Sequence, residues 1–124
     1  MGKKLKFGIV GCGNIFNGAH IYAYENNDDF EAVAFCDIIL DKAISTAEKL
    51  GVSKEHCYES FEEMLEKEEL DAVDICTPNY LHSVVAVAAL NKGINVFCEK
   101  PDAVSVAEAN KMKEAAEKSG KVLM

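Results

Sequence analysis

A short glycine-rich segment near the start of the chain has the residue types and spacing of an anion-binding loop. The apolar run 6–10 leads directly into Gly11-Cys12-Gly13, where the helix predicted over 14–24 begins. Gly11 permits a tight turn, and Gly13 lacks a Cβ, so the backbone can approach a diphosphate closely. The helix N-terminus directs free N–H groups and the positive end of its dipole at the same anion. The segment predicts a dinucleotide site, with an ordinary glycine turn as the alternative.

The third glycine of the dinucleotide-binding fingerprint is absent from this loop. Phe16 stands in its place, and Gly18 follows two residues later. That glycine normally serves close packing of the helix on the strand and makes no contact with phosphate. We therefore expect a slightly displaced first helix and an intact anion site.

An acidic residue at the end of the second apolar run strengthens the prediction. Asp37 follows the run 30–36, near the ~20-residue offset expected for the carboxylate that binds the adenosine ribose. A helix-capping or solvated aspartate is the alternative. Asp37 would repel a ribose 2′-phosphate, and the apolar residues 38–40 follow it with no arginine nearby. NAD is therefore favoured over NADP, while Lys42 keeps NADP as the alternative.

Short apolar runs alternate with amphipathic segments along the whole chain. Such alternation predicts right-handed β-α-β crossovers and a mostly parallel sheet, and continuous apolar runs indicate strands buried on both faces. The predicted strands are 6–10, 30–36, 57–58, 72–76 and 95–98, with a sixth that begins at 121. The predicted helices include 14–24, 41–50 and 81–91. Two more helices follow capping boxes at Ser60 and Ser105 and end near residues 67 and 119, respectively. The predicted fold class is α/β, a Rossmann-type doubly wound sheet with helices on both faces, and the chain is expected to be truncated after the sixth strand.

Composition and charge narrow the class of protein. The 124 residues suffice for one domain, and the formal net charge of −8 argues against partners such as nucleic acid or an anionic membrane surface. No apolar run approaches the ~20 residues of a membrane span. The five cysteines are odd in number and form no C-x-x-C pair, so a reducing cytoplasm is expected. We interpret them as small buried thiols, with a metal or redox cluster at one sheet edge as the alternative.

Two further polar loops follow the fourth and fifth predicted strands. They are Thr77-Pro78-Asn79, with His82 close behind, and Glu99-Lys100-Pro101. In an open parallel sheet ligands bind outside the carboxyl ends of the strands, so both loops are expected beside the glycine loop. Lys100 lies between an acidic residue and a proline that restricts its backbone. It suits hydrogen bonding to a substrate or ribose hydroxyl, and a solvated surface lysine is the alternative.

The order of these motifs resembles the N-terminal domain of the Gfo/Idh/MocA oxidoreductases, and Glu99-Lys100-Pro101 is the most specific of them. The resemblance covers nearly the whole chain. It implies a dinucleotide-binding domain over 1–124 with NAD or NADP as cofactor and Lys100 assisting catalysis. The cofactor-binding residues that it implies are Gly11, Cys12, Gly13, Asn14, Ile15, Asp37, Thr77, Pro78, Asn79, His82, Glu99 and Lys100.

The same resemblance implies a reaction and a missing partner domain. Members of the family transfer hydride between the nicotinamide and a sugar- or polyol-like substrate. Their second domain carries substrate specificity, the general acid/base and the oligomer interface. This chain is expected to lack that domain, and therefore to bind cofactor without turnover. The full-length protein is expected to form a homo-oligomer. We interpret none of His20, His56 and His82 as the proton-transfer residue. The alternatives are a stand-alone nucleotide-binding regulatory module and a glycosidase-type enzyme that uses NAD transiently.

Overall fold

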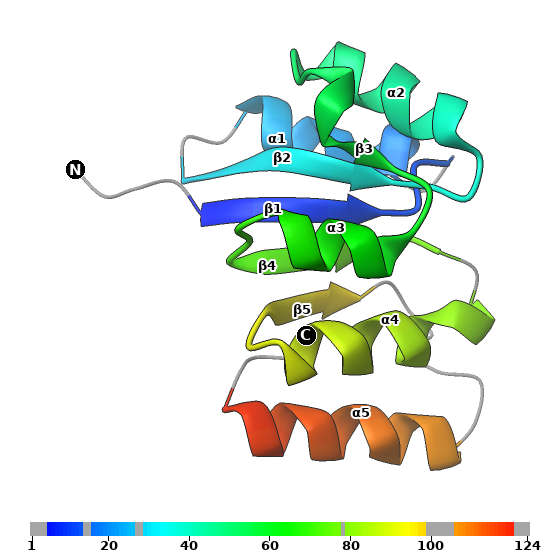
Figure 1. Cartoon of the computed structure of the whole chain (residues 1–124), viewed down its shortest axis with the longest axis vertical. Coiled ribbons are helices and arrows are strands. Elements are labelled where there is room, and N and C mark those ends of the chain that lie inside the picture. The colour runs from blue at the N-terminus through cyan, green and yellow to red at the C-terminus, as the bar shows by residue number, and fades with distance from the viewer. Residues whose placement is uncertain (1–4, 14–15, 27–28, 78, 99–105, 121–124) are drawn as a thin grey trace.

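A five-stranded parallel sheet forms the centre of the computed structural model, which describes residues 5–13, 16–26, 29–77, 79–98 and 106–120. All neighbouring strands pair in parallel. This strand order is that of a doubly wound Rossmann sheet, so the predicted fold class is confirmed. The strands are β1 (Leu5–Val10), β2 (Phe30–Cys36), β3 (Cys57–Tyr58), β4 (Ala72–Ile75) and β5 (Asn95–Cys98), in the order β3-β2-β1-β4-β5 (Figure 1).

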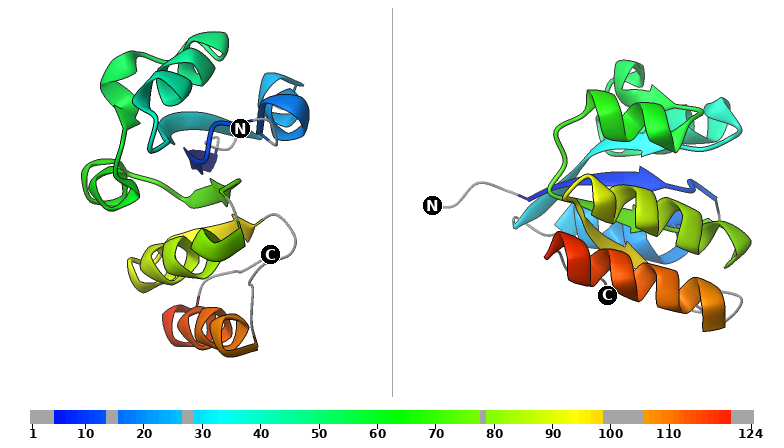
Figure 2. Two further views of the ribbon diagram at one scale, coloured as in Figure 1. Left: turned by 90° about the vertical axis from the view of Figure 1, so that its right-hand side faces the viewer. Right: turned by 60° about the horizontal axis from the view of Figure 1, so that its bottom comes forward.

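Helices cover both faces of the sheet. They are α1 (Ile21–Asn26), α2 (Leu40–Lys49), α3 (Phe61–Lys67), α4 (Asn79–Asn91) and α5 (Val106–Ser119), and α5 packs against α4 (Figure 2). Two hydrophobic cores result. The first contains Met64 of α3, Leu90 of α4 and Val73 of β4, and the second contains Phe16 and Phe35 of β2. No helix within the described ranges is long and apolar enough to cross a bilayer.

Most predicted elements lie where the sequence pattern puts them, and the first helix differs. Strands β2, β3 and β5 have the predicted bounds, and α2 and α4 begin one or two residues early, within the usual scatter of helix ends. The segment expected to be one helix over 14–24 instead begins with a π-helical turn, Phe16–His20, that leads into α1. The predicted sixth strand and the Ser105 cap lie outside the described residues.

The Ser60 cap illustrates how local sequence starts a helix. Its hydroxyl accepts a hydrogen bond from the Glu63 N–H at 3.3 Å, as the capping-box pattern predicts. The capping-box pattern also predicts that the Glu63 carboxylate reaches back to the Ser60 N–H, and the described residues show a different partner for it. The Glu63 carboxylate accepts a hydrogen bond from Lys67 at 2.7 Å, because an acid and a lysine four residues apart lie on one helix face.

Gly11 allows β1 and β4 to approach each other at the edge where both strands end. Its φ is +96°, a conformation that favours glycine. A Cβ at this position would lie 2.7 Å from both the carbonyl carbon and the oxygen of Cys76. Both the dihedral angle and the contact with Cys76 therefore require glycine at position 11. This requirement comes from the packing of the backbone and does not depend on a bound ligand.

Replacing Gly11 by alanine should destabilise the chain. We expect Gly11→Ala to lower the free energy of unfolding by roughly 2 kcal/mol or more, since a side chain at this φ is strained and contacts backbone atoms that cannot move away. Gly18→Ala is the matched control, because a Cβ there would meet no atom of the described part of the chain within 4 Å. Urea unfolding curves that shift equally for the two variants would contradict this interpretation.

Candidate functional site

The carboxyl ends of β1, β2 and β4 meet at one edge of the sheet, where the strand order reverses. The chain runs outward from β1 to β3 and then crosses over to β4, and doubly wound sheets bind ligands at this point. Hydrogen bonding continues past the strands: the Gly11 N–H donates to the Cys36 carbonyl at 2.8 Å, and the Cys76 N–H donates to the Val10 carbonyl at 2.7 Å. The glycine loop is therefore fixed to both neighbouring strands.

Asp37 ties the glycine loop to the turn after β2. Its Oδ2 accepts a hydrogen bond from the Cys12 N–H at 2.9 Å, and its Oδ1 accepts one from the Ile39 N–H at 2.9 Å. A carboxylate has about four lone-pair positions, so acceptor capacity remains for a pair of ligand hydroxyls. Ile38 and Ile39 are 76% and 50% exposed beside this carboxylate. The turn thus presents a hydrogen-bond acceptor next to an apolar surface.

Asn17 holds the other side of the glycine loop, and the sequence analysis did not identify it. Its Nδ2 donates to the carbonyls of Cys12 at 2.9 Å and Gly13 at 3.0 Å, and contacts the buried Thr46 hydroxyl at 3.2 Å. Lys49 donates to the Asn17 Oδ1 at 3.0 Å. The carbonyls of Cys12 and Gly13 are therefore turned toward a protein donor, which limits their repulsion of a bound anion. An asparagine one helical turn after a glycine loop was the available signal.

The loop leaves room for a diphosphate at Gly13. A Cβ built on Gly13 meets no described heavy atom within 4 Å. The Phe16 side chain does not fill this space, since its ring is fully buried and packs edge-on against Phe35, with centroids 6.4 Å apart. The described residues therefore fit a dinucleotide.

A pocket of about 290 Å³ lies at this edge of the sheet. Four of the predicted binding residues line it, namely Gly11, Gly13, Asp37 and Thr77, and Lys42 lines it too. Cys12, which was also predicted to bind the cofactor, lies buried in the loop between Gly11 and Gly13. The other predicted residues are not placed: Asn14, Ile15, Pro78, Glu99 and Lys100, together with the side chains of Asn79 and His82, lie outside the described residues.

The thiols near the pocket are packing groups. Cys12 and Cys36 are buried, and both are free thiols. Burial, assisted by the negative charge of Asp37, raises the pKa of the Cys36 thiol to about 12 and that of Cys12 further still. Both groups therefore stay protonated at neutral pH and are poor nucleophiles.

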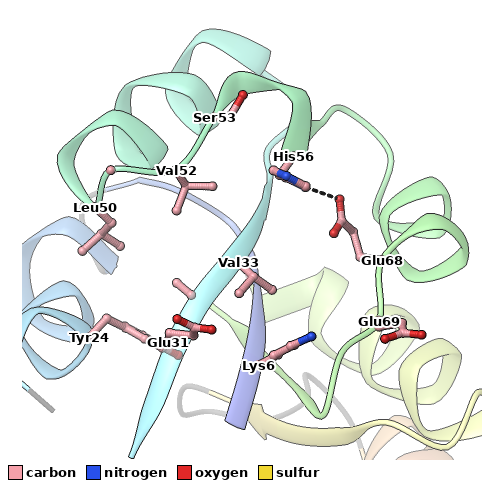
Figure 3. Close-up of a pocket in the computed structure, with 12 residues that line it drawn as sticks. Lys6, Tyr24, Glu31, Val33, Leu50, Val52, Ser53, His56, Glu68 and Glu69 are labelled. Carbon is pink, nitrogen blue, oxygen red and sulfur yellow. Dashed lines mark hydrogen bonds and ion pairs between the residues drawn. The ribbon is translucent and has the colours of Figure 1, made fainter. Parts of the chain in front are cut away.

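A larger hollow of about 710 Å³ opens at the other end of the sheet (Figure 3). Lys6 of β1 and Glu31 of β2 line it, together with His56 and Glu68. His56 is 46% exposed and pairs with the Glu68 carboxylate at 2.9 Å, which also accepts a hydrogen bond from Tyr58 at 2.6 Å. The hollow lies at the amino ends of the strands, where parallel α/β sheets do not bind ligands as a rule. The smaller pocket is therefore the candidate site.

Comparison with known proteins agrees with this geometry. Residues 5–124 match the model of the Gfo/Idh/MocA oxidoreductase family, described as an NAD-binding Rossmann fold. The chain is 36% identical over 119 residues to D-glucoside 3-dehydrogenase of Escherichia coli K12, a match covering 96% of this chain and 33% of the relative. It is 37% identical over 118 residues to inositol 2-dehydrogenase of Salmonella typhimurium, covering 94% and 34%. The chain thus spans about a third of the length of these relatives.

A solved structure with bound cofactor has the same fold. The WlbA dehydrogenase of Bordetella pertussis, in complex with NADH and UDP-GlcNAcA, superposes with a TM-score of 0.89 at 30% sequence identity. The match covers 98% of this chain and 36% of that one. The described fold is therefore that of a domain found in an NADH-containing dehydrogenase.

The raised thiol pKa values predict slow alkylation. At pH 8 a thiol with a pKa near 12 is ionised in roughly one molecule in ten thousand, against about a quarter for an ordinary cysteine. We expect iodoacetamide to modify Cys12 and Cys36 at least about a hundredfold more slowly in the folded chain than in urea, as followed by peptide mass spectrometry. Equal rates in the two states would show that these thiols are exposed and reactive.

Proposed function

The chain belongs to the Gfo/Idh/MocA oxidoreductase family, and we propose that it is the NAD-binding domain of a dehydrogenase acting on a sugar- or polyol-like substrate. The glycine loop carries this proposal: hydrogen bonds fix its backbone on both sides, Asn17 donates to the carbonyls of Cys12 and Gly13, and a Cβ on Gly13 would meet no atom of the described residues within 4 Å. In a chain with net charge −8, a backbone site supplies the positive potential that side chains do not.

Each half of the cofactor has a set of residues suited to it. The backbone around Gly13 would hold the diphosphate, and the free acceptor capacity of Asp37 would bind the adenosine ribose hydroxyls. The exposed side chains of Ile38 and Ile39 lie where the adenine ring could pack. The second nucleotide would then lie across the strand reversal, over the ends of β4 and β5, near Thr77.

We propose that this chain is the cofactor domain of a longer protein, and that the catalytic step takes place in that longer protein. When bound, the nicotinamide accepts or donates the hydride. We assign Lys100 to hydrogen bonding at the substrate and nicotinamide ribose, beside Glu99, with Asn14, Ile15, Pro78, Asn79 and His82 completing the cofactor contacts. A second domain would supply the substrate pocket and the homo-oligomer interface. The dehydrogenase names and the threefold length of the relatives support this division.

The thiols also support a proposed compartment. Cys12, Cys36 and Cys57 are free thiols, and Cys57 is only half-buried. Free thiols persist in reducing surroundings, which supports a place in the cytoplasm.

Calorimetric titration with NADH tests the proposal. The chain should bind NADH, and Gly13→Val should abolish binding because the new side chain occupies the diphosphate space. Asp37→Ala should weaken binding about tenfold or more, since it removes charged hydrogen bonds to the ribose and to the loop. Asp41→Ala, which removes an exposed carboxylate from the first turn of α2, is the control and should bind like the parent. A parent chain that does not bind NADH would refute the proposal.

The charge of Asp37 should set the preference for NADH over NADPH. Asp37→Asn keeps an acceptor for the Cys12 N–H but removes the charge. Since like charges about 4 Å apart near a surface repel by up to a few kcal/mol, we expect the ratio of NADH to NADPH affinity to fall about tenfold or more. Lys42→Ala should raise the same ratio if Lys42 attracts the 2′-phosphate. A parent that prefers NADPH, or a ratio unchanged in Asp37→Asn, would contradict the assignment to Asp37.

A further inference from the structure

An ionisable side chain lies fully buried in the middle of the sheet. Asp74 is 1% exposed and belongs to the apolar strand β4. A buried carboxylate is costly unless donors surround it. His20 Nδ1 lies 2.8 Å and 2.9 Å from its two oxygens, and the Tyr24 hydroxyl donates to Oδ2 at 2.9 Å. The cluster of Asp74, His20 and Tyr24, here called the Asp74 hub, satisfies the carboxylate within the protein.

The hub connects Asp74 to the segment that directly follows the glycine loop. Phe16, His20 and Tyr24 are spaced four residues apart, and the π-helical turn Phe16–His20 ends at the hub histidine. The Phe16 ring packs on both hub rings, with centroids 6.3 Å from His20 and 5.7 Å from Tyr24. The loop that holds the diphosphate space is therefore anchored through this segment to the middle of β4.

The hub also reaches the strand ends that carry the other two predicted loops. Cys76, two residues after Asp74, places its Sγ 3.4 Å from His20 Nδ1 and precedes Thr77. Phe97 of β5 lies beside Asp74 in the sheet register, and its ring centroid is 5.7 Å from that of His20. One set of side chains thus contacts the segment that follows the loop after β1 and the strand ends that lead into the loops after β4 and β5.

Two other chemistries fit the hub less well. A Cys-His-Asp relay needs the two ring nitrogens to face different partners, whereas Nδ1 of His20 faces both Cys76 and Asp74. His20, Asp74 and Cys76 also present three potential metal ligands. Tetrahedral zinc with bonds of 2.0–2.2 Å would hold its nitrogen and oxygen ligands about 3.3 Å apart. The observed separation of 2.8 Å is that of a hydrogen bond.

We propose that the Asp74 hub is a positioning device for the nicotinamide half of the cofactor. The hub fixes the position of the glycine loop relative to the ends of β4 and β5. In the proposed function, on which this inference rests, the second nucleotide lies over those strand ends. The adenosine half depends on Asp37, which is fixed by β2 and the loop through other bonds. Loss of the hub should therefore weaken binding of the nicotinamide ring more than binding of the ADP-ribose portion of the cofactor.

The test compares NADH with ADP-ribose, which lacks only the nicotinamide. For each variant, calorimetry gives the two dissociation constants, and their ratio reports the nicotinamide contribution. The parent should bind NADH more tightly than ADP-ribose. Asp74→Asn should reduce that preference about tenfold or remove it, while binding of ADP-ribose changes by less than about threefold. The emission of bound NADH, which reports the nicotinamide environment, should shift toward that of free NADH.

Two variants complete the design. Tyr24→Phe removes one hydrogen bond from the hub, and it replaces Asp74→Asn as the decisive variant if the latter does not fold. Asp71→Asn is the matched control: this exposed carboxylate lies just before β4 and accepts a hydrogen bond from the Lys6 N–H at 2.8 Å. It should leave both dissociation constants unchanged.

Three results would overturn the proposal. The first is a folded hub variant in which both ligands weaken by the same factor, as a purely structural role predicts. The second is a parent with no preference for NADH over ADP-ribose, although it binds both; failure to bind either would instead refute the proposed function. The third is stoichiometric zinc in the purified parent that Asp74→Asn loses, which would make the cluster a metal site.

Discussion

The close approach of two backbones at Gly11 is the constraint on which the site depends. Gly11 has a φ of +96°, and the Cys76 carbonyl lies 2.7 Å from where a Cβ of residue 11 would stand. Because Gly11 has no Cβ, the chain can leave β1 and pass directly against the end of β4. Hydrogen bonds from Gly11 to Cys36 and from Cys76 to Val10 hold this crossing from both sides. The first turn after the loop then starts at the edge where β1, β2 and β4 all end.

In the proposed function, an anion site made of backbone groups lets a chain with a net charge of −8 bind a dinucleotide. Asn17 engages the loop carbonyls, and Asp37 holds the Cys12 N–H while retaining acceptor capacity. The same carboxylate would then select a free ribose diol and disfavour a 2′-phosphate. In the proposed function, Asp37 therefore affects both the loop geometry and the choice of cofactor. Its variants have to be interpreted through the ratio of NADH to NADPH affinity as well as through single dissociation constants.

Local and periodic features could be predicted from the sequence. The strands 30–36, 57–58 and 95–98 follow from apolar runs, the Ser60 cap follows from a four-residue pattern, and Gly11, Asp37 and Thr77 meet because parallel strands share a carboxyl edge. Residues whose roles depend on distant partners were missed. Asn17 meets Thr46 across 29 positions, and His20 meets Asp74 across 54. The signal for Asp74 was a lone acid in an apolar strand, which requires a partner that the sequence alone does not identify. The helical periodicity likewise did not predict the π-helical turn Phe16–His20, whose first residue packs against Phe35 of β2.

A crystal structure of the chain with NADH is the most direct test of the central claim. The account predicts diphosphate oxygens within hydrogen-bond distance of the backbone N–H groups around Gly13, the adenosine ribose hydroxyls on Asp37, and the second nucleotide over the ends of β4 and β5. Density for NADH in the hollow lined by Lys6 and Glu31 at the opposite edge of the sheet, with the glycine loop unchanged and without ligand, would contradict it.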